Sequence, residues 1–207
     1  MCLYILFEVI YLLIIFINFF IGTYSEILNI GPVLISIIYT IINKSKEVKG
    51  NIYLILSLFF SLLGDIFFLL IDKHAVGISS FIIVQIFYLF FLIGRSNKIL
   101  LFALLNFIIC CIFDQKIIII QVIIYALLFI INIIFSTIKT KSKKVSALFI
   151  VSLICLLICD INVAIISKTD LSQSLKIALS IIEWTSYTLN LILVTLLANG
   201  LIMIKME

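Results

Sequence analysis

Two aspartates, Asp65 and Asp160, stand deep inside long runs of apolar residues, at similar positions along their runs. A carboxylate in an apolar environment is costly, so a residue kept there usually has a function. Burial favours the protonated form of a carboxyl group, and a second carboxylate nearby favours it further. If the two side chains meet, one can hold a proton near neutral pH while the other is ionised. The pair is therefore suited to protonating a substrate atom while activating a water molecule.

Other polar residues recur at helical spacing along four of the apolar runs, in one run together with Gly77 and Phe81 on the same face. The four sets are Tyr4, Glu8, Tyr11 and Asn18; Gly77, Phe81, Gln85 and Tyr88; Gln121, Tyr125, Asn132 and Ser136; and Glu183, Tyr187 and Asn190. Residues three or four apart share one helix face, so we expect these faces to line a shared interior and not to meet lipid.

Two glutamates lie within two turns of an expected helix end, namely Glu8 and Glu183. A long acidic side chain near a helix end can extend to the lipid headgroups and avoid burial. We expect Glu8 to do so. Glu183 shares its helix face with Tyr187 and Asn190, and we place it with them among the candidate substrate-binding residues.

The composition indicates which kind of chain must position these side chains. Of the 207 residues, 65% are apolar and 12% are charged, against about 45–50% and about 25% in soluble domains. An ordinary soluble domain and a disordered chain are thereby excluded. A membrane-spanning helix needs about 20 apolar residues, which leaves room for about eight spans and no soluble domain. We predict an all-α fold, a polytopic transmembrane helix bundle that forms a single integral-membrane domain over residues 1–207.

Eight apolar runs are the predicted spans. They are Cys2–Gly22, Leu28–Ile42, Asn51–Ile71, Val76–Gly94, Ile99–Phe113, Ile117–Ser136, Val145–Ser167 and Lys176–Ile204. The runs are long and lack the alternation of barrel strands, which favours helices. The second and fifth runs are short for a span. No small-residue cleavage site follows the first run, so we interpret it as a span and not as a signal peptide.

The basic residues are distributed unevenly between the connecting segments. Ten lie in the even-numbered segments and at the C-terminus (Lys44, Lys46, Lys49, Arg95, Lys98, Lys139, Lys141, Lys143, Lys144 and Lys205), and four in the odd-numbered segments (Lys73, Lys116, Lys168 and Lys176). The positive-inside rule then places both termini in the cytoplasm. Abundant Ile, Lys and Asn are typical of an AT-rich genome, so we expect a bacterial plasma membrane. No basic patch is large enough to bind nucleic acid.

No motif for a metal or a cofactor is visible, and we expect neither. The five cysteines, Cys2, Cys110, Cys111, Cys155 and Cys159, lie in or beside apolar runs and lack the partners of a metal site. We interpret them as packing residues. The chain also has no nucleophile elbow, no zinc-protease motif and no phosphate-binding loop.

The third and seventh runs are similar to each other. Ser61-Leu-Leu-Gly-Asp65-Ile aligns with Leu156-Leu-Ile-Cys-Asp160-Ile, and each run is followed by one that carries a Tyr and an amide. Two parallel four-helix halves would produce such a repeat. In a chain rich in Ile and Leu the similarity can also arise by chance, so both interpretations stay open.

Two of these segments resemble motifs of the YhhN-like family of lysoplasmalogenases. They are Ser61-Leu-Leu-Gly-Asp65 and Gly77-x3-Phe81-x3-Gln85-x2-Tyr88, where the family reads approximately S-L-x-G-D and G-x3-F-x3-H-x2-Y. The later Cys159-Asp160 and Tyr187-x2-Asn190 are similar to the family's Ser-Asp and Tyr-x2-Gln. Gln85 departs from the family's His and removes a titratable group, which puts a proton-relay role at that position in doubt.

The resemblance implies an integral-membrane hydrolase that cleaves the vinyl ether bond of lysoplasmalogen to a fatty aldehyde and a glycerophospho head group. Asp65 and Asp160 would be its catalytic pair, one donating a proton and the other stabilising the resulting cation and orienting water. The residues that would bind water, the ether oxygen or the glycerol hydroxyl are Gln85, Tyr88, Tyr187, Asn190 and Glu183. The partners would be a lysophospholipid substrate and the lipid bilayer, through which its tail would approach.

Two other readings of the aspartate pair compete with this one. An intramembrane aspartyl protease would need a Gly two residues before Gly64 and a downstream Pro-Ala-Leu element, whereas the only proline is Pro32. A proton-coupled small transporter or lipid-binding membrane protein could use the same pair. Its usual marker, matching interruptions of helices in two halves, is missing from the sequence.

Overall fold

The eight apolar runs form eight α-helices in a computed structural model of the chain. The structure describes residues 1–21, 28, 30–43, 51–71, 73–94, 96–112, 118–140, 142–168 and 172–200. The helices are α1 (Cys2–Ile21), α2 (Gly31–Asn43), α3 (Asn51–Leu69), α4 (His74–Ile93), α5 (Asn97–Ile112), α6 (Ile118–Lys139), α7 (Lys143–Lys168) and α8 (Gln173–Ala198). The described residues contain no strand, and the predicted all-α bundle is confirmed.

Five of these helices are long and apolar enough to cross a membrane, namely α3, α4, α6, α7 and α8. The apolar parts of α1, α2 and α5 are shorter. Large apolar side chains lie exposed along the outside of the bundle, such as Ile42 at 73% and Ile119 at 75%. An outer surface of this kind requires a hydrocarbon environment. The chain is therefore a multi-pass membrane protein.

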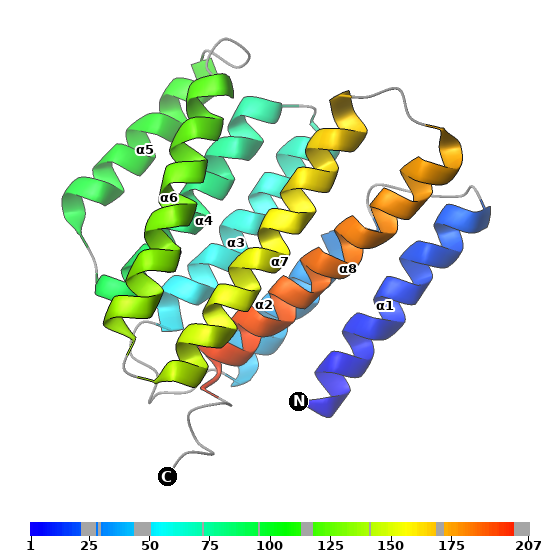
Figure 1. Ribbon diagram of the computed structural model, residues 1–207, viewed down its shortest axis with the longest axis horizontal. Helices are drawn as coiled ribbons and strands as arrows, with labels where there is room; N and C mark the ends of the chain where they lie inside the picture. Colours follow the sequence, from blue (N-terminus) through cyan, green and yellow to red (C-terminus); the bar gives the residue numbers. More distant parts are fainter. Residues whose placement is uncertain are drawn as a thin grey trace.

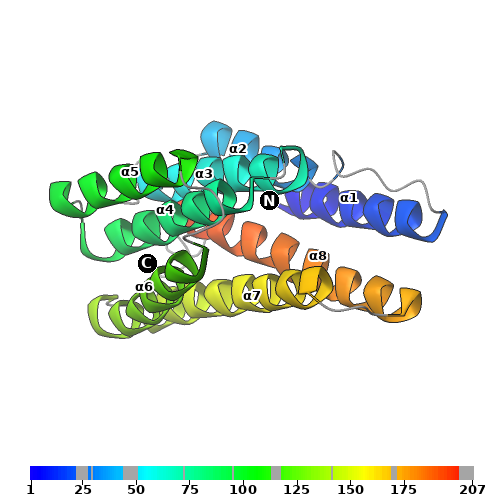
Figure 2. The same ribbon diagram turned by 90° about the horizontal axis from the view of Figure 1, so that it is seen from above.

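Two helices organise the packing. The first is α4, which contacts α3, α5 and α6, and the second is α8, which contacts α1, α2, α3 and α7 (Figures 1 and 2). Of the five long spans, α4 has the largest buried share. Consecutive helices run in opposite directions, so the start of α1 and the end of α8 lie at the same end of the bundle (Figure 1).

Two glycines let α3 and α4 approach closely. A Cβ atom at Gly64 of α3 would lie 2.8 Å from Cε2 of Phe81, and one at Gly77 of α4 would lie 2.5 Å from Cδ2 of Phe68. Each helix thus presses a phenylalanine ring onto a glycine of the other. These two contacts explain why the sequence motifs contain Gly-Asp and Gly-x3-Phe, since the glycines and Phe81 are needed for helix packing. They also bring Asp65 toward α4.

The helix contacts are compatible with two similar halves. The contacts α3–α4, α2–α3, α2–α8 and α1–α8 correspond to α7–α8, α6–α7, α6–α4 and α5–α4 when helices 1–4 are exchanged with 5–8. The correspondence is incomplete, because among the described residues α5 makes no contact with α6 as extensive as that of α1 with α2.

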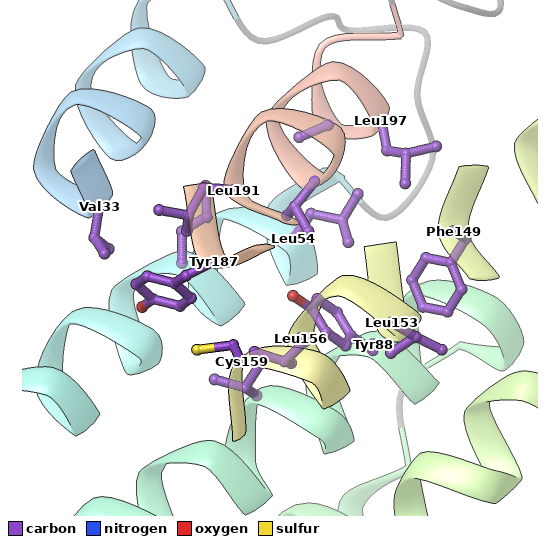
Figure 3. Packing of buried hydrophobic residues seen from close by; sticks show 14 of the residues in the cluster. Val33, Leu54, Tyr88, Phe149, Leu153, Leu156, Cys159, Tyr187, Leu191 and Leu197 are labelled. Carbon is purple, nitrogen blue, oxygen red and sulfur yellow. The ribbon is translucent and has the colours of Figure 1, made fainter. Parts of the chain in front are cut away.

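An apolar cluster between α3, α4, α7 and α8 surrounds several polar groups. Tyr88, Tyr187 and Cys159 lie in this cluster beside Leu156 and Leu191 (Figure 3). Cys155 and Cys159 are free thiols and are buried, as expected of packing residues, whereas Cys2 is exposed and does not pack inside the bundle.

Several charges that led to the predicted orientation lie outside the described residues: Lys44, Lys46, Lys49, Arg95, Lys116, Lys141 and Lys205. The same holds for the predicted span ends at Gly22, Phe113, Ile117 and Ile204. The side chains of Cys110 and Cys111 are likewise outside the described part of the chain.

Candidate functional site

The carboxyl groups of three acidic residues lie within electrostatic range of one another near one end of the bundle. Asp65 lies in the last turns of α3, Asp160 in the last third of α7, and Glu183 in the first half of α8. Because α8 runs opposite to α3 and α7, these positions fall at a similar level. Asp65 interacts electrostatically with Asp160 and Glu183, and Glu183 does so with Asp160. The structure thus brings together the two aspartates that the sequence singled out.

Asp65 is held by a tyrosine of α8. The hydroxyl group of Tyr187 donates a hydrogen bond of 2.6 Å to Oδ2 of Asp65. Both residues are buried, with 8% of Asp65 and 3% of Tyr187 exposed. The bond crosses from α8 to α3, which places the carboxyl group at the contact between the two halves of the sequence.

Asp160 stands at the end of a chain of hydrogen bonds that starts on α6. Asn132 donates through Nδ2 to both the backbone oxygen and Oε1 of Gln85, at 2.9 and 2.8 Å. Gln85 then donates through Nε2 to the hydroxyl oxygen of Tyr125 at 3.3 Å. The hydroxyl of Tyr125 in turn donates to Oδ2 of Asp160 at 2.5 Å. All donors point the same way, so the chain directs the Tyr125 proton at the carboxyl group.

A second polar set lies behind the two aspartates. The hydroxyl group of Tyr88 interacts with the side chains of Ser57 and Asn190. Ser152 of α7 donates to Oδ1 of Asn190 at 2.7 Å. Tyr88 and Asn190 are each 1% exposed. They therefore tie α4 to α8 and α7 as well as lining the site.

The five residues that the sequence predicts to bind substrate differ in whether their polar atoms already have partners within the protein. Gln85, Tyr88, Tyr187 and Asn190 already have protein partners, as described above. Glu183 is half-buried and faces the aspartates. Among these five residues, Glu183 is thus the one most open to its surroundings.

Sequence reasoning did not assign a role to Tyr125, Asn132 or Ser152. The first two belong to the polar face noted for residues 121–136, and this periodicity was the available signal. Which of the many tyrosines would meet an aspartate depends on the rotation of each helix, which periodicity does not define. Ser152 carries no signal beyond a single hydroxyl in an apolar run.

The expectation that Glu8 reaches the headgroups is wrong. Its side chain is 0% exposed, and Ser36 of α2 donates a hydrogen bond of 2.9 Å to its Oε1. The polar face of α1 turns toward α2 and α8, so Glu8 is enclosed by protein despite its place near the helix start.

The arrangement can perform acid–base chemistry on a lipid-soluble molecule. Two carboxyl groups lie near each other in a largely apolar setting, and each accepts a hydrogen bond from a tyrosine. Such hydrogen bonds fix the orientation of each carboxyl group through its Oδ2 atom. Within the described residues, no group of three or more His, Cys, Asp or Glu side chains is placed to hold a metal ion.

The comparisons with known proteins identify the family. The model of the YhhN family matches residues 25–198, which include every candidate site residue from Asp65 to Asn190. No curated protein matches the chain significantly, and neither does any solved structure. The match covers most of the chain and the whole carboxyl cluster, and the protein belongs to the YhhN family.

Proposed function

We propose that this protein is a lysoplasmalogenase, which hydrolyses the vinyl ether bond of a lysoplasmalogen to a fatty aldehyde and a glycerophospho head group. One observation carries the proposal: buried Asp65 and half-buried Asp160, on different helices, lie within electrostatic range of each other, and each accepts a hydrogen bond from a tyrosine at one carboxyl oxygen. Family membership supports it, because the family model matches residues 25–198, a range that contains both aspartates.

The chemistry of the bond needs an acid and a base in one place. Protonation of the vinyl carbon by one aspartic acid gives an oxocarbenium ion, which the second, ionised aspartate stabilises. Water then adds to the cation and returns its proton to the enzyme. The hemiacetal breaks into aldehyde and alcohol, so atoms and charge balance without a cofactor. The hydrogen bonds from Tyr125 and Tyr187 hold the carboxyl groups in position for these steps.

The substrate would approach from the bilayer. Its single tail would suit the apolar surroundings of the carboxyl groups, and Glu183, which is half-buried, would bind the glycerol hydroxyl. With both termini in the cytoplasm, as the lysine distribution predicts, the site lies in the outer half of the membrane.

The proposal is tested by supplying the purified protein with a vinyl ether lysophospholipid in heavy water. An ester-linked lysophospholipid of equal chain length is the matched control substrate. We expect fatty aldehyde from the vinyl ether alone, carrying one deuterium on the carbon next to the carbonyl. That label reports protonation at carbon, and the product must be trapped at once to prevent exchange.

Two outcomes would contradict the proposal. Equal cleavage of both substrates would indicate an esterase. A folded protein that releases no aldehyde would favour the proton-coupled transporter or lipid-binding reading of the same aspartate pair. The continuous helices α3, α4, α7 and α8 count against that reading, since transport sites usually use interrupted helices.

A further inference from the structure

A second buried carboxyl group lies at the opposite end of the bundle from Asp65 and Asp160. Glu8 belongs to the first half of α1, and Tyr4 one turn earlier shares its face. Thr40 in the last turn of α2 and Thr195 in the last turn of α8 lie at the same end. Ser36 of α2 completes this group, which we name the Glu8 cluster. Its five members come from three helices and are each at most 2% exposed.

Short contacts join the members of the Glu8 cluster. Ser36 donates to Oε1 of Glu8 at 2.9 Å, and the hydroxyl oxygens of Tyr4 and Ser36 are 2.8 Å apart. Tyr4 and Thr195 are joined at 3.2 Å, and Thr40 and Thr195 at 3.4 Å. Thr40 also donates to the backbone oxygen of Ser36 at 2.7 Å. The side-chain polar atoms of the cluster are all oxygens.

The charge of Glu8 has no counterpart in these contacts. Oε2 of Glu8 is buried and has no hydrogen-bond partner among the described residues. The groups that act on Glu8 are the hydroxyls of Ser36 and Tyr4, neither of which is positive. An isolated carboxylate away from water is strongly disfavoured, so something must neutralise it. A proton on Oε2 would donate to a nearby acceptor, and none of the described residues places one within hydrogen-bond distance of that atom.

We propose that the Glu8 cluster is a binding site for one small monovalent cation, for which Na⁺ is the ion to test. Hard cations prefer carboxylate, hydroxyl and carbonyl oxygens, which are the groups present. A single carboxylate balances a single positive charge, whereas divalent sites generally use more carboxylates. Successive hydroxyl oxygens of the cluster lie 2.8 to 3.4 Å apart, which is a spacing that the ligands of a small ion can have. The bound ion would tie α1 to α2 and α8.

The site is independent of the proposed hydrolase chemistry. It lies at the other end of α8 from Glu183 and shares no residue with the carboxyl pair. Glu8 also precedes residues 25–198, over which the family model matches. The result of a cation-binding experiment is therefore independent of the result of the aldehyde assay.

The test is equilibrium binding of radioactive Na⁺ to the purified full chain in choline chloride. We expect saturable binding of about one ion per chain, displaced by unlabelled Na⁺ and less well by K⁺. Glu8→Gln removes the charge and keeps the shape, and should lower Na⁺ affinity at least about a hundredfold, because a buried charge pair loses one partner. Glu183→Gln removes a carboxyl group from the other end of the bundle and should bind Na⁺ as the wild type does.

The wild-type measurement decides the matter even if Glu8→Gln does not fold. Absence of saturable Na⁺ binding by the folded wild type would overturn the proposal and leave a proton as the neutralising group. Equal Na⁺ binding by Glu8→Gln and the wild type would overturn it too. Ser36→Ala, which retains the carboxyl group, should weaken Na⁺ binding without abolishing it.

Discussion

Two tyrosine hydroxyls determine how the aspartates of the candidate site are held. Tyr187 reaches Asp65 from α8, and Tyr125 reaches Asp160 from α6. The second bond is directed by Gln85, which Asn132 holds at two atoms. Gln85 stands at the position where the family motif usually has a histidine. In the proposed mechanism Gln85 is a positioning group, since an amide can orient a hydroxyl without exchanging a proton.

Removing either tyrosine hydroxyl should slow the proposed reaction. A hydrogen bond to a charged group contributes about 1.5–3 kcal/mol, so Tyr125→Phe and Tyr187→Phe should each lower kcat about ten- to a hundredfold. Tyr53→Phe is the matched control, because Tyr53 contacts Phe87 and Phe90 through its ring, away from the aspartates. Steady-state aldehyde release provides the measurement. Rates for both site variants as high as that of Tyr53→Phe would argue against a role for these bonds.

At the scale of elements, the close contact of α3 with α4 positions Asp65. Gly64→Ala and Gly77→Ala would each force a methyl group against a phenylalanine ring at 2.8 and 2.5 Å. Overpacking of this kind costs about 1–3 kcal/mol. We expect both variants to unfold at lower temperature in detergent, with aldehyde release lost as Asp65 shifts.

A substitution on the lipid-facing side is the control for this prediction. Ala126→Leu adds more bulk on the exposed face of α6 and should leave the thermal midpoint nearly unchanged. An unchanged midpoint for Gly64→Ala and Gly77→Ala would mean that α3 and α4 are farther apart than the structure places them.

At the scale of the whole molecule, the lysine distribution predicts the orientation of the bundle. The start of α1 and the end of α8 lie at one end, and the positive-inside rule assigns that end to the cytoplasm. In a bacterial host, a fluorescent protein fused to the C-terminus should therefore fluoresce, and alkaline phosphatase fused there should be inactive. The reverse pattern would place the carboxyl pair on the cytoplasmic side.

The helices of this chain follow from its apolar runs, because in a bilayer every backbone group must be satisfied within its own helix. The two aspartates could be singled out from the sequence, because a carboxyl group deep in an apolar span is costly and is seldom kept without a function. The partners of Asp65 and Asp160 could not be identified, because a rotation of α6 or α8 would present a different side chain. The burial of Glu8 does not follow from the sequence, because the distance of a residue from a helix end does not reveal that α2 and α8 cover that end.

Aldehyde release by Asp65→Asn and Asp160→Asn tests the account most directly, after each variant is shown to fold by its thermal midpoint. Asparagine keeps the shape and can accept from the tyrosine, but it can neither donate the proton nor carry the negative charge. The account predicts a loss of at least about a hundredfold for each variant, and no much larger loss for the double variant, because the two groups act as a unit. Release near the wild-type rate by either single variant would contradict the paired-aspartate mechanism.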